Sequence, residues 1–142
     1  MRTPPCFYIE TQPEDSKESM FYRIMQTVPA YYRRYEDIAV AALLERERMG
    51  STLVVPGLAI AHGQADVFQH TYIGAYMLSH PILWNQEGKR VRVLTLFLLP
   101  MQPAPTPVAY IHRLMHHMAE DAYSYALTQA KDIQALQKML TV

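Results

Sequence analysis

The chain of 142 residues has little cysteine, no net charge and no long apolar segment. Its single cysteine, Cys6, excludes an internal disulfide and a cysteine-rich zinc site. Thirteen Lys and Arg balance thirteen Asp and Glu, so the basic surplus of a nucleic-acid-binding protein is absent. The longest apolar run, 93–101, is about half the length of a membrane-spanning helix. The N-terminal residues also lack the apolar core of a signal peptide. We therefore expect a cytoplasmic protein with no nucleic-acid partner and no direct membrane insertion.

Short segments rich in β-branched and aromatic residues predict the strands. They are expected at 7–9, 53–55, 58–61, 71–78, 82–84 and 91–99. Asn85 to Gly88 is a turn signal, so the last two segments should pair as a hairpin. The arm 91–99 is almost wholly apolar, which is typical of a central strand that is covered on both faces.

Apolar residues at helical spacing predict the helices. The first should follow Asp15, with Glu18 as its capping-box partner, and end before Pro29. The segment 30–35 is expected to be a connection. Further helices are expected at 36–49, from Pro107 with Thr106 as N-cap, at 122–130, and after Asp132. Half of the residues are apolar and 18% are charged. Together these features predict a single α/β domain over residues 1–142, with a mixed central sheet and helices on both faces.

Two neighbouring motifs carry the chemical information. Residues 43–52 read LLERERMGST, and residues 57–63 read GLAIAHG. They resemble, in order and spacing, the LLxRExxGST and G(I/V)A(I/V)PH motifs of the phosphotransferase-system enzyme IIA domain of the fructose–mannitol class. A later stretch, with 81–84, a glycine-bearing turn and 91–100, resembles the hairpin of that family. The resemblance covers essentially the whole chain.

This resemblance implies that His62 is phosphorylated and that Arg46 stabilises the phosphoryl group. The chemistry is reasonable, because a neutral imidazole is nucleophilic near pH 7 and can carry a phosphoryl group covalently. Arginine presents a planar fork that binds phosphate oxygens in pairs. Thr52 of the first motif is a possible supporting residue. Gly57 and Gly63 would allow a close approach of the backbone.

The resemblance also implies two protein partners. The histidine-containing phosphocarrier protein would donate the phosphoryl group, and the cysteine of a sugar-specific enzyme IIB would accept it. Cys6 lies outside any recognisable carrier motif, so we do not expect it to be that acceptor. The scheme requires no cofactor and no metal.

The sequence departs from the family pattern at two positions. Ala61 replaces the proline that precedes the active-site histidine. The family usually has a second histidine in an HLxxLxxLA pattern, and the apolar register of the later helix places Pro107 in that slot. A proline has no side-chain donor, although His112, one turn further on, could substitute. These departures keep a second function open, that of a catalytically degenerate regulatory or interaction module.

Other interpretations of the same residues remain open at this point. His62 could be an ordinary loop or core histidine, and Arg46 could be a solvated residue paired with Glu45 or Glu47. His112 and His116 have the i, i+4 spacing of metal ligands, which would suit a metal-dependent hydrolase, although the sequence fixes no third ligand.

Overall fold

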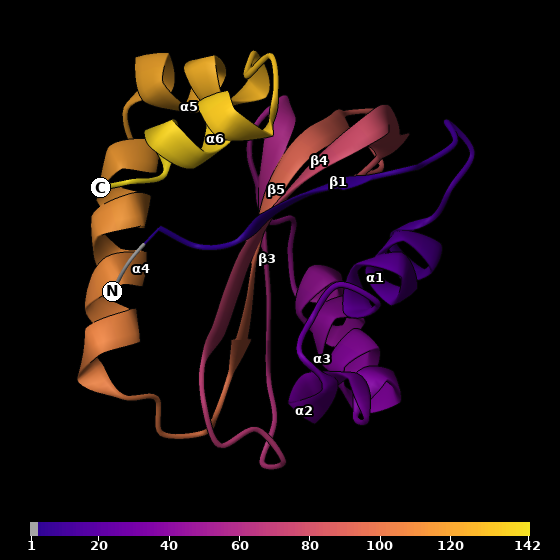
Figure 1. Cartoon of the computed structure of the whole chain (residues 1–142). Helices are drawn as coiled ribbons and strands as arrows, with labels where there is room; N and C mark the ends of the chain where they lie inside the picture. The colour runs from indigo at the N-terminus through magenta and orange to yellow at the C-terminus, as the bar shows by residue number, and fades with distance from the viewer. Residues whose placement is uncertain (1–2) are drawn as a thin grey trace.

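Figure 1 shows a computed structural model of the chain, which describes residues 3–142. These residues form five strands: β1 (Cys6–Ile9), β2 (Leu53–Val55), β3 (Gly57–Gln64), β4 (Tyr72–Leu83) and β5 (Arg90–Leu99). They also form six helices: α1 (Lys17–Met25), α2 (Ala30–Arg33), α3 (Glu36–Arg48), α4 (Pro105–Met118), α5 (Asp121–Thr128) and α6 (Ile133–Met139). None of the helices in this part of the chain is long and apolar enough to cross a membrane.

The strands form one mixed sheet in the order β1-β4-β5-β3-β2. Strand β5 is antiparallel to β4 and parallel to β3, and it lies at the centre of the sheet. Its continuous apolar sequence is therefore explained, because both of its faces are buried. Strand β2 lies at the edge and pairs with β3 only at Leu58 and Ala59. The later part of β3, which contains His62, pairs with β5 but extends beyond β2.

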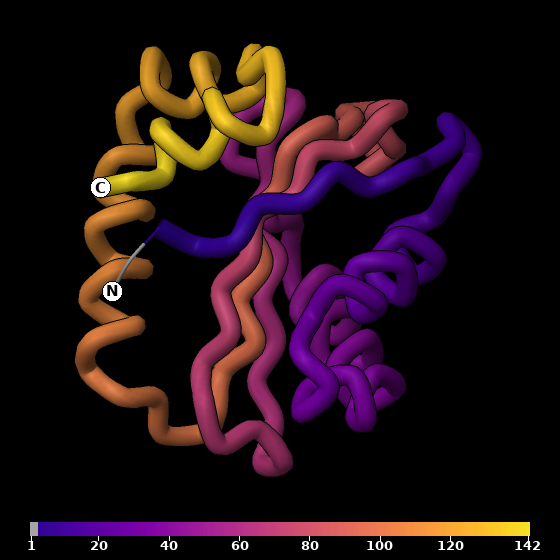
Figure 2. Tube along the Cα trace, in the orientation of Figure 1, coloured from indigo at the N-terminus to yellow at the C-terminus, as the bar shows by residue number. Residues whose placement is uncertain are grey.

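Helices cover both faces of the sheet, which confirms the predicted α/β architecture. The chain from α1 to α3 lies on one side, and α4, α5 and α6 lie on the other (Figure 2). Successive side chains of a strand point to opposite faces. Ala61 therefore belongs to the core beside α3, whereas His62 faces the side on which α4 packs.

Gly63 determines how closely α3 can approach β3. A Cβ atom at this position would lie 3.0 Å from the Cβ of Ala42 and 3.1 Å from the backbone nitrogen of Leu43. Any larger residue would push the helix away from the strand. The glycine thus keeps the C-terminal half of α3, including Arg46, close to the strand that carries His62.

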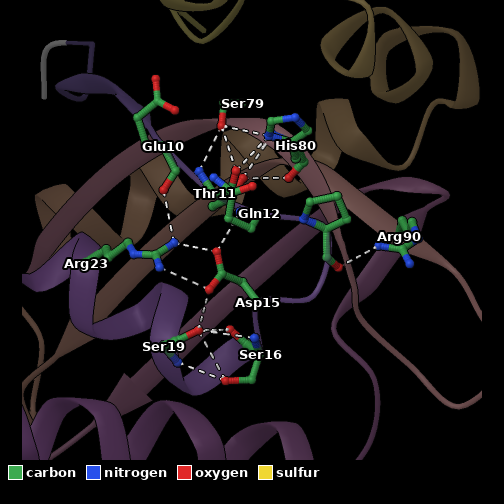
Figure 3. A network of polar contacts seen from close by, with 11 residues as sticks. Glu10, Thr11, Gln12, Asp15, Ser16, Ser19, Arg23, Ser79, His80 and Arg90 are labelled. Carbon is green, nitrogen blue, oxygen red and sulfur yellow. Dashed lines mark hydrogen bonds and ion pairs between the residues drawn. The ribbon is translucent and has the colours of Figure 1, made fainter.

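The cap of α1 differs from the prediction. Ser16, not Asp15, is the N-cap, and its capping-box partner is Ser19, not Glu18. Asp15 lies one residue too early for this role. Its carboxylate instead accepts hydrogen bonds from the Gln12 backbone and from Arg23 at the other end of α1 (Figure 3).

The same polar network joins the segment after β1 to the irregular middle of β4. The Thr11 backbone N–H donates to the Ser79 hydroxyl at 2.8 Å, and the Thr11 hydroxyl donates to the His80 carbonyl at 2.6 Å (Figure 3). The His80 Nδ1 atom lies 2.7 Å from the Thr11 carbonyl. His80 therefore has a structural role in this part of the sheet.

Three other boundaries also differ from the predictions. Residues 30–33 form the short helix α2, because Tyr32 is buried in the core. The segments predicted as two strands at 71–78 and 82–84 are one strand, β4, with an irregular register between Met77 and Ile82. Helix α4 begins at Pro105 with Ala104 as N-cap, because Pro105 occupies the first helical position that proline favours.

Candidate functional site

A cavity of about 350 Å³ lies beside His62. Its polar side chains come from the end of α3, from the segment that joins α3 to β2, and from β3: Arg46, Ser51, Thr52 and His62. Its apolar side chains come from β2, β3, β5 and α4: Leu53, Ile60, Phe97, Leu99, Ile111 and Met115. The fold therefore brings His62, Arg46 and Thr52 to one place.

His62 is half-buried in this cavity. Burial is the main cause that lowers the pKa of its imidazole below the ordinary value of 6.5, and the Arg46 guanidinium lowers it further. The Ile60 backbone and the Glu47 carboxylate act in the opposite direction. The net effect keeps the imidazole neutral at pH 7, which is the form that can act as a nucleophile.

Arg46 is held by the loop that follows its own helix. Its Nη1 atom donates to the Gly50 carbonyl at 2.8 Å. Gly50 has a φ of +147°, a conformation that L side chains rarely adopt, so glycine is needed at this turn. Across residues 3–142, Arg46 forms no ion pair, because Glu45 pairs with Arg48 and Glu47 pairs with Lys17. Its positive charge is therefore not neutralised by a carboxylate.

Thr52 is buried, and its hydroxyl both donates and accepts a hydrogen bond. The hydroxyl donates to Glu47 Oε2 at 2.5 Å and accepts from the Trp84 indole at 3.2 Å. The other carboxylate oxygen of Glu47 binds Lys17 Nζ at 3.1 Å, and the Glu47 side chain is only 4% exposed. This network fixes the loop 50–52 against α1 and the β4–β5 turn.

Sequence reasoning did not identify Glu47, Lys17 or Trp84 as parts of the site. Glu47 and Trp84 belong to the motifs that resemble enzyme IIA, so the motifs themselves contained a signal. No sequence motif pointed to Lys17, because its contact with Glu47 joins two helices that are distant in sequence.

The structure does not bring the remaining predicted residues to the cavity wall. His112 is exposed on α4, and Ile111 and Met115 are the residues that this helix contributes. Gly57 has a φ of +100° and packs against α5, where a Cβ atom would lie 3.0 Å from Thr128 Cγ2. Its role is thus a turn at the start of β3.

Two of the other interpretations can be compared with the geometry. His116, like His112, is exposed on α4, and residues 3–142 contain no group of three or more His, Cys, Asp or Glu placed to hold a metal. Cys6 is half-buried in β1, and burial raises the pKa of its thiol to about 11, which disfavours the nucleophilic thiolate.

Comparisons with known proteins give a consistent result. The nitrogen regulatory protein IIA-Ntr from Neisseria meningitidis is 17% identical, with a TM-score of 0.73 over 94% of this chain and 92% of that chain. The complex of mannitol enzyme IIA with phosphorylated enzyme IIB from Escherichia coli gives 14% identity and a TM-score of 0.66, over 94% and 92%. The mannitol-specific cryptic phosphotransferase enzyme IIA from Escherichia coli is 12% identical, with a TM-score of 0.66 over 99% of this chain and 93% of that chain.

At these identities the solved structures show a shared fold. No curated protein sequence matches the chain. The sequence pattern of a family does match, and it spans residues 8–142, nearly the full length. The motifs around Arg46 and His62 lie within this span. The chain therefore belongs to the EIIA 2 family of the phosphoenolpyruvate-dependent sugar phosphotransferase system.

Proposed function

We propose that this protein is a phosphohistidine carrier of the phosphotransferase system and that His62 is the phosphorylated residue. A ring nitrogen of neutral His62 attacks the phosphorus of the phosphohistidine on the histidine phosphocarrier protein. The new P–N bond forms as the donor's P–N bond breaks, and no water is consumed. In the next step the cysteine thiolate of an enzyme IIB attacks the phosphorus, and His62 leaves as neutral imidazole.

The observation that carries the proposal is that His62 and Arg46 share one cavity, with the imidazole kept neutral by burial. Phosphoryl transfer depends on positioning and on stabilising the charge of the phosphoryl oxygens. The unneutralised guanidinium of Arg46 is suited to that task.

Two further features support the choice of partners. One neighbour of similar fold is an enzyme IIA in complex with a phosphorylated enzyme IIB, which makes an enzyme IIB the acceptor we favour. The wall opposite Arg46 is apolar and includes Met115, which is 48% exposed, so a partner protein could pack against it. We place this relay in the cytoplasm.

A regulatory module without phosphoryl transfer is the alternative function. The feature that favours it is Pro107, which the apolar register of α4 assigns to the slot of the second histidine that the family usually has. The α4 wall of the cavity has no polar side chain to replace it, because its members are Ile111 and Met115.

Phosphorylation in a reconstituted relay separates the two functions. The protein is incubated with phosphoenolpyruvate, enzyme I and the phosphocarrier protein, and acid-labile phosphate is mapped by mass spectrometry. We expect label on His62 in the wild type and none in His62→Ala. The matched control is His116→Ala, which removes an exposed histidine outside the cavity and should be labelled normally. Undiminished labelling of His62→Ala would overturn the carrier assignment, and no labelling of the wild type would favour the regulatory module.

A further inference from the structure

The cavity beside His62 contains two neighbouring hydroxyl side chains, Ser51 and Thr52. They differ in whether the hydroxyl already donates a hydrogen bond to another residue. A phosphoryl group on His62 would present oxygens that accept hydrogen bonds, so a useful neighbour must have a donor that is not already committed.

Thr52 has no donor left. Its hydroxyl hydrogen is given to the buried Glu47 carboxylate, and its oxygen accepts from the Trp84 indole. Turning this hydroxyl toward a phosphoryl group would leave a buried carboxylate with one partner fewer, which is costly in a low-dielectric setting.

Ser51 has its donor free. Across residues 3–142 its hydroxyl makes one hydrogen bond, in which the oxygen accepts from the Leu53 backbone N–H at 3.2 Å. The hydrogen therefore has no protein acceptor. The residue is exposed, so its side chain can rotate toward a ligand without the loss of a buried contact.

The need for such a donor follows from the rest of the wall. The side chain of Arg46 is one charged donor, and the Thr52 hydroxyl is committed elsewhere. The residues from β5 and α4 are apolar, and Pro107 on α4 has no donor. Ser51 is thus the remaining side chain of the cavity wall that can donate to an anion.

We propose that Ser51 is a catalytic residue that donates a hydrogen bond to the phosphoryl group on His62, and that it supplies, from the polar wall, a donor that Pro107 on α4 lacks. Arg46 and Ser51 then bind the phosphoryl oxygens from the two ends of one short segment. Thr52 and Glu47 hold that segment in position and do not touch the phosphoryl group. This inference rests on the proposed function of His62.

Three variants test the proposal in the reconstituted relay. Ser51→Ala removes the donor, and we expect phosphoryl transfer to and from His62 to become about tenfold slower, which is typical of one lost hydrogen bond to a charged group. Ser51→Thr keeps the hydroxyl and should restore most of the rate. Ser16→Ala is the matched control, since it removes an exposed hydroxyl that also accepts a backbone N–H, at the start of α1 and outside the cavity.

Thermal melts of the same variants separate a lost donor from a disturbed loop. We expect Ser51→Ala to melt close to the wild type. An equal rate loss in Ser51→Ala and Ser51→Thr would assign the effect to loop shape and overturn the proposal. Wild-type transfer rates in Ser51→Ala would overturn it as well, while labelling of His62 in the wild type would leave the carrier function intact. If the wild type takes up no phosphoryl group, the carrier function and the role of Ser51 both fail.

Discussion

The two walls of the His62 cavity differ in chemistry. The wall formed by the end of α3 and the loop 50–52 is polar, and hydrogen bonds fix the side chains of Arg46 and Thr52. The wall formed by β5 and α4 is apolar and includes Phe97 and Ile111. Both walls lower the pKa of His62, because one removes water and the other holds a positive charge. Separate parts of the fold thus contribute to the neutral state of one imidazole.

The largest effect should come from removing the charge of the polar wall. We expect Arg46→Ala to slow phosphoryl transfer to and from His62 about a hundredfold, as for other preorganised donors that stabilise developing charge. Arg46→Lys should also be impaired, because lysine lacks the two-pronged geometry. Stability should change by no more than about 1 kcal/mol, since the lost contact is one hydrogen bond to a carbonyl.

Arg48→Ala is the matched control for this prediction. Arg48 lies on the same helix, but its side chain is 77% exposed and pairs with Glu45, which is exposed as well. Rapid-quench measurements of phosphoryl transfer beside thermal melts would compare the variants. If Arg46→Ala transfers at the rate of Arg48→Ala, the polar wall does not bind the phosphoryl group, and the regulatory function becomes the better proposal.

The next effect concerns what holds the polar wall in place. Valine has nearly the same shape as threonine, but Thr52→Val leaves the Glu47 Oε2 atom without its donor and the Trp84 indole without its acceptor. We expect the free energy of unfolding to fall by about 2 kcal/mol, whereas Thr52→Ser should lose less. Trp84 is the only tryptophan of the chain, so urea titrations can be followed by its fluorescence.

Thr106→Val provides the reference for this measurement. Thr106 is exposed in the first turn of α4, so its change should stay within about 0.5 kcal/mol. If Thr52→Val and Thr106→Val had the same free energy of unfolding, the buried hydrogen bonds of Thr52 would not stabilise the polar wall.

Much of the fold was predictable from local patterns. The turn residues around Asn85 and the apolar run of β5 placed a hairpin and a central strand correctly. The caps were harder, because Ser16 and Asp15 are both good N-caps and the choice depends on Arg23, eight residues further on. The continuity of β4 across Pro81 was also hidden, since proline usually marks the end of a strand.

The candidate site was predictable only in part. The motifs pointed to His62 and Arg46, and the structure places both in one cavity. The contacts of Thr52 with Glu47 and Trp84 depend on how α3 packs against the β4–β5 turn, which no local pattern encodes. The difference between Ser51 and Thr52 follows from those contacts, so it could not be derived before the tertiary structure was known.

The smallest effect is the pH dependence that both walls impose on His62. Its pKa in the folded protein lies below the ordinary value of 6.5, while in the unfolded chain the ordinary value applies. The unfolded state therefore binds more protons as the pH falls below 6.5, and the folded state loses stability between 6.5 and its own lower pKa. Above pH 6.5 this loss of stability vanishes.

We expect His62→Gln to lack this loss of stability, and Arg46→Ala to raise the pKa of His62, because one of the causes that lowers it is removed. NMR titration of the imidazole protons measures the pKa directly, and urea titrations at several pH values measure the stability. A wild-type pKa at or above 6.5, or the same pKa in Arg46→Ala, would contradict the view that the two walls act together on the imidazole.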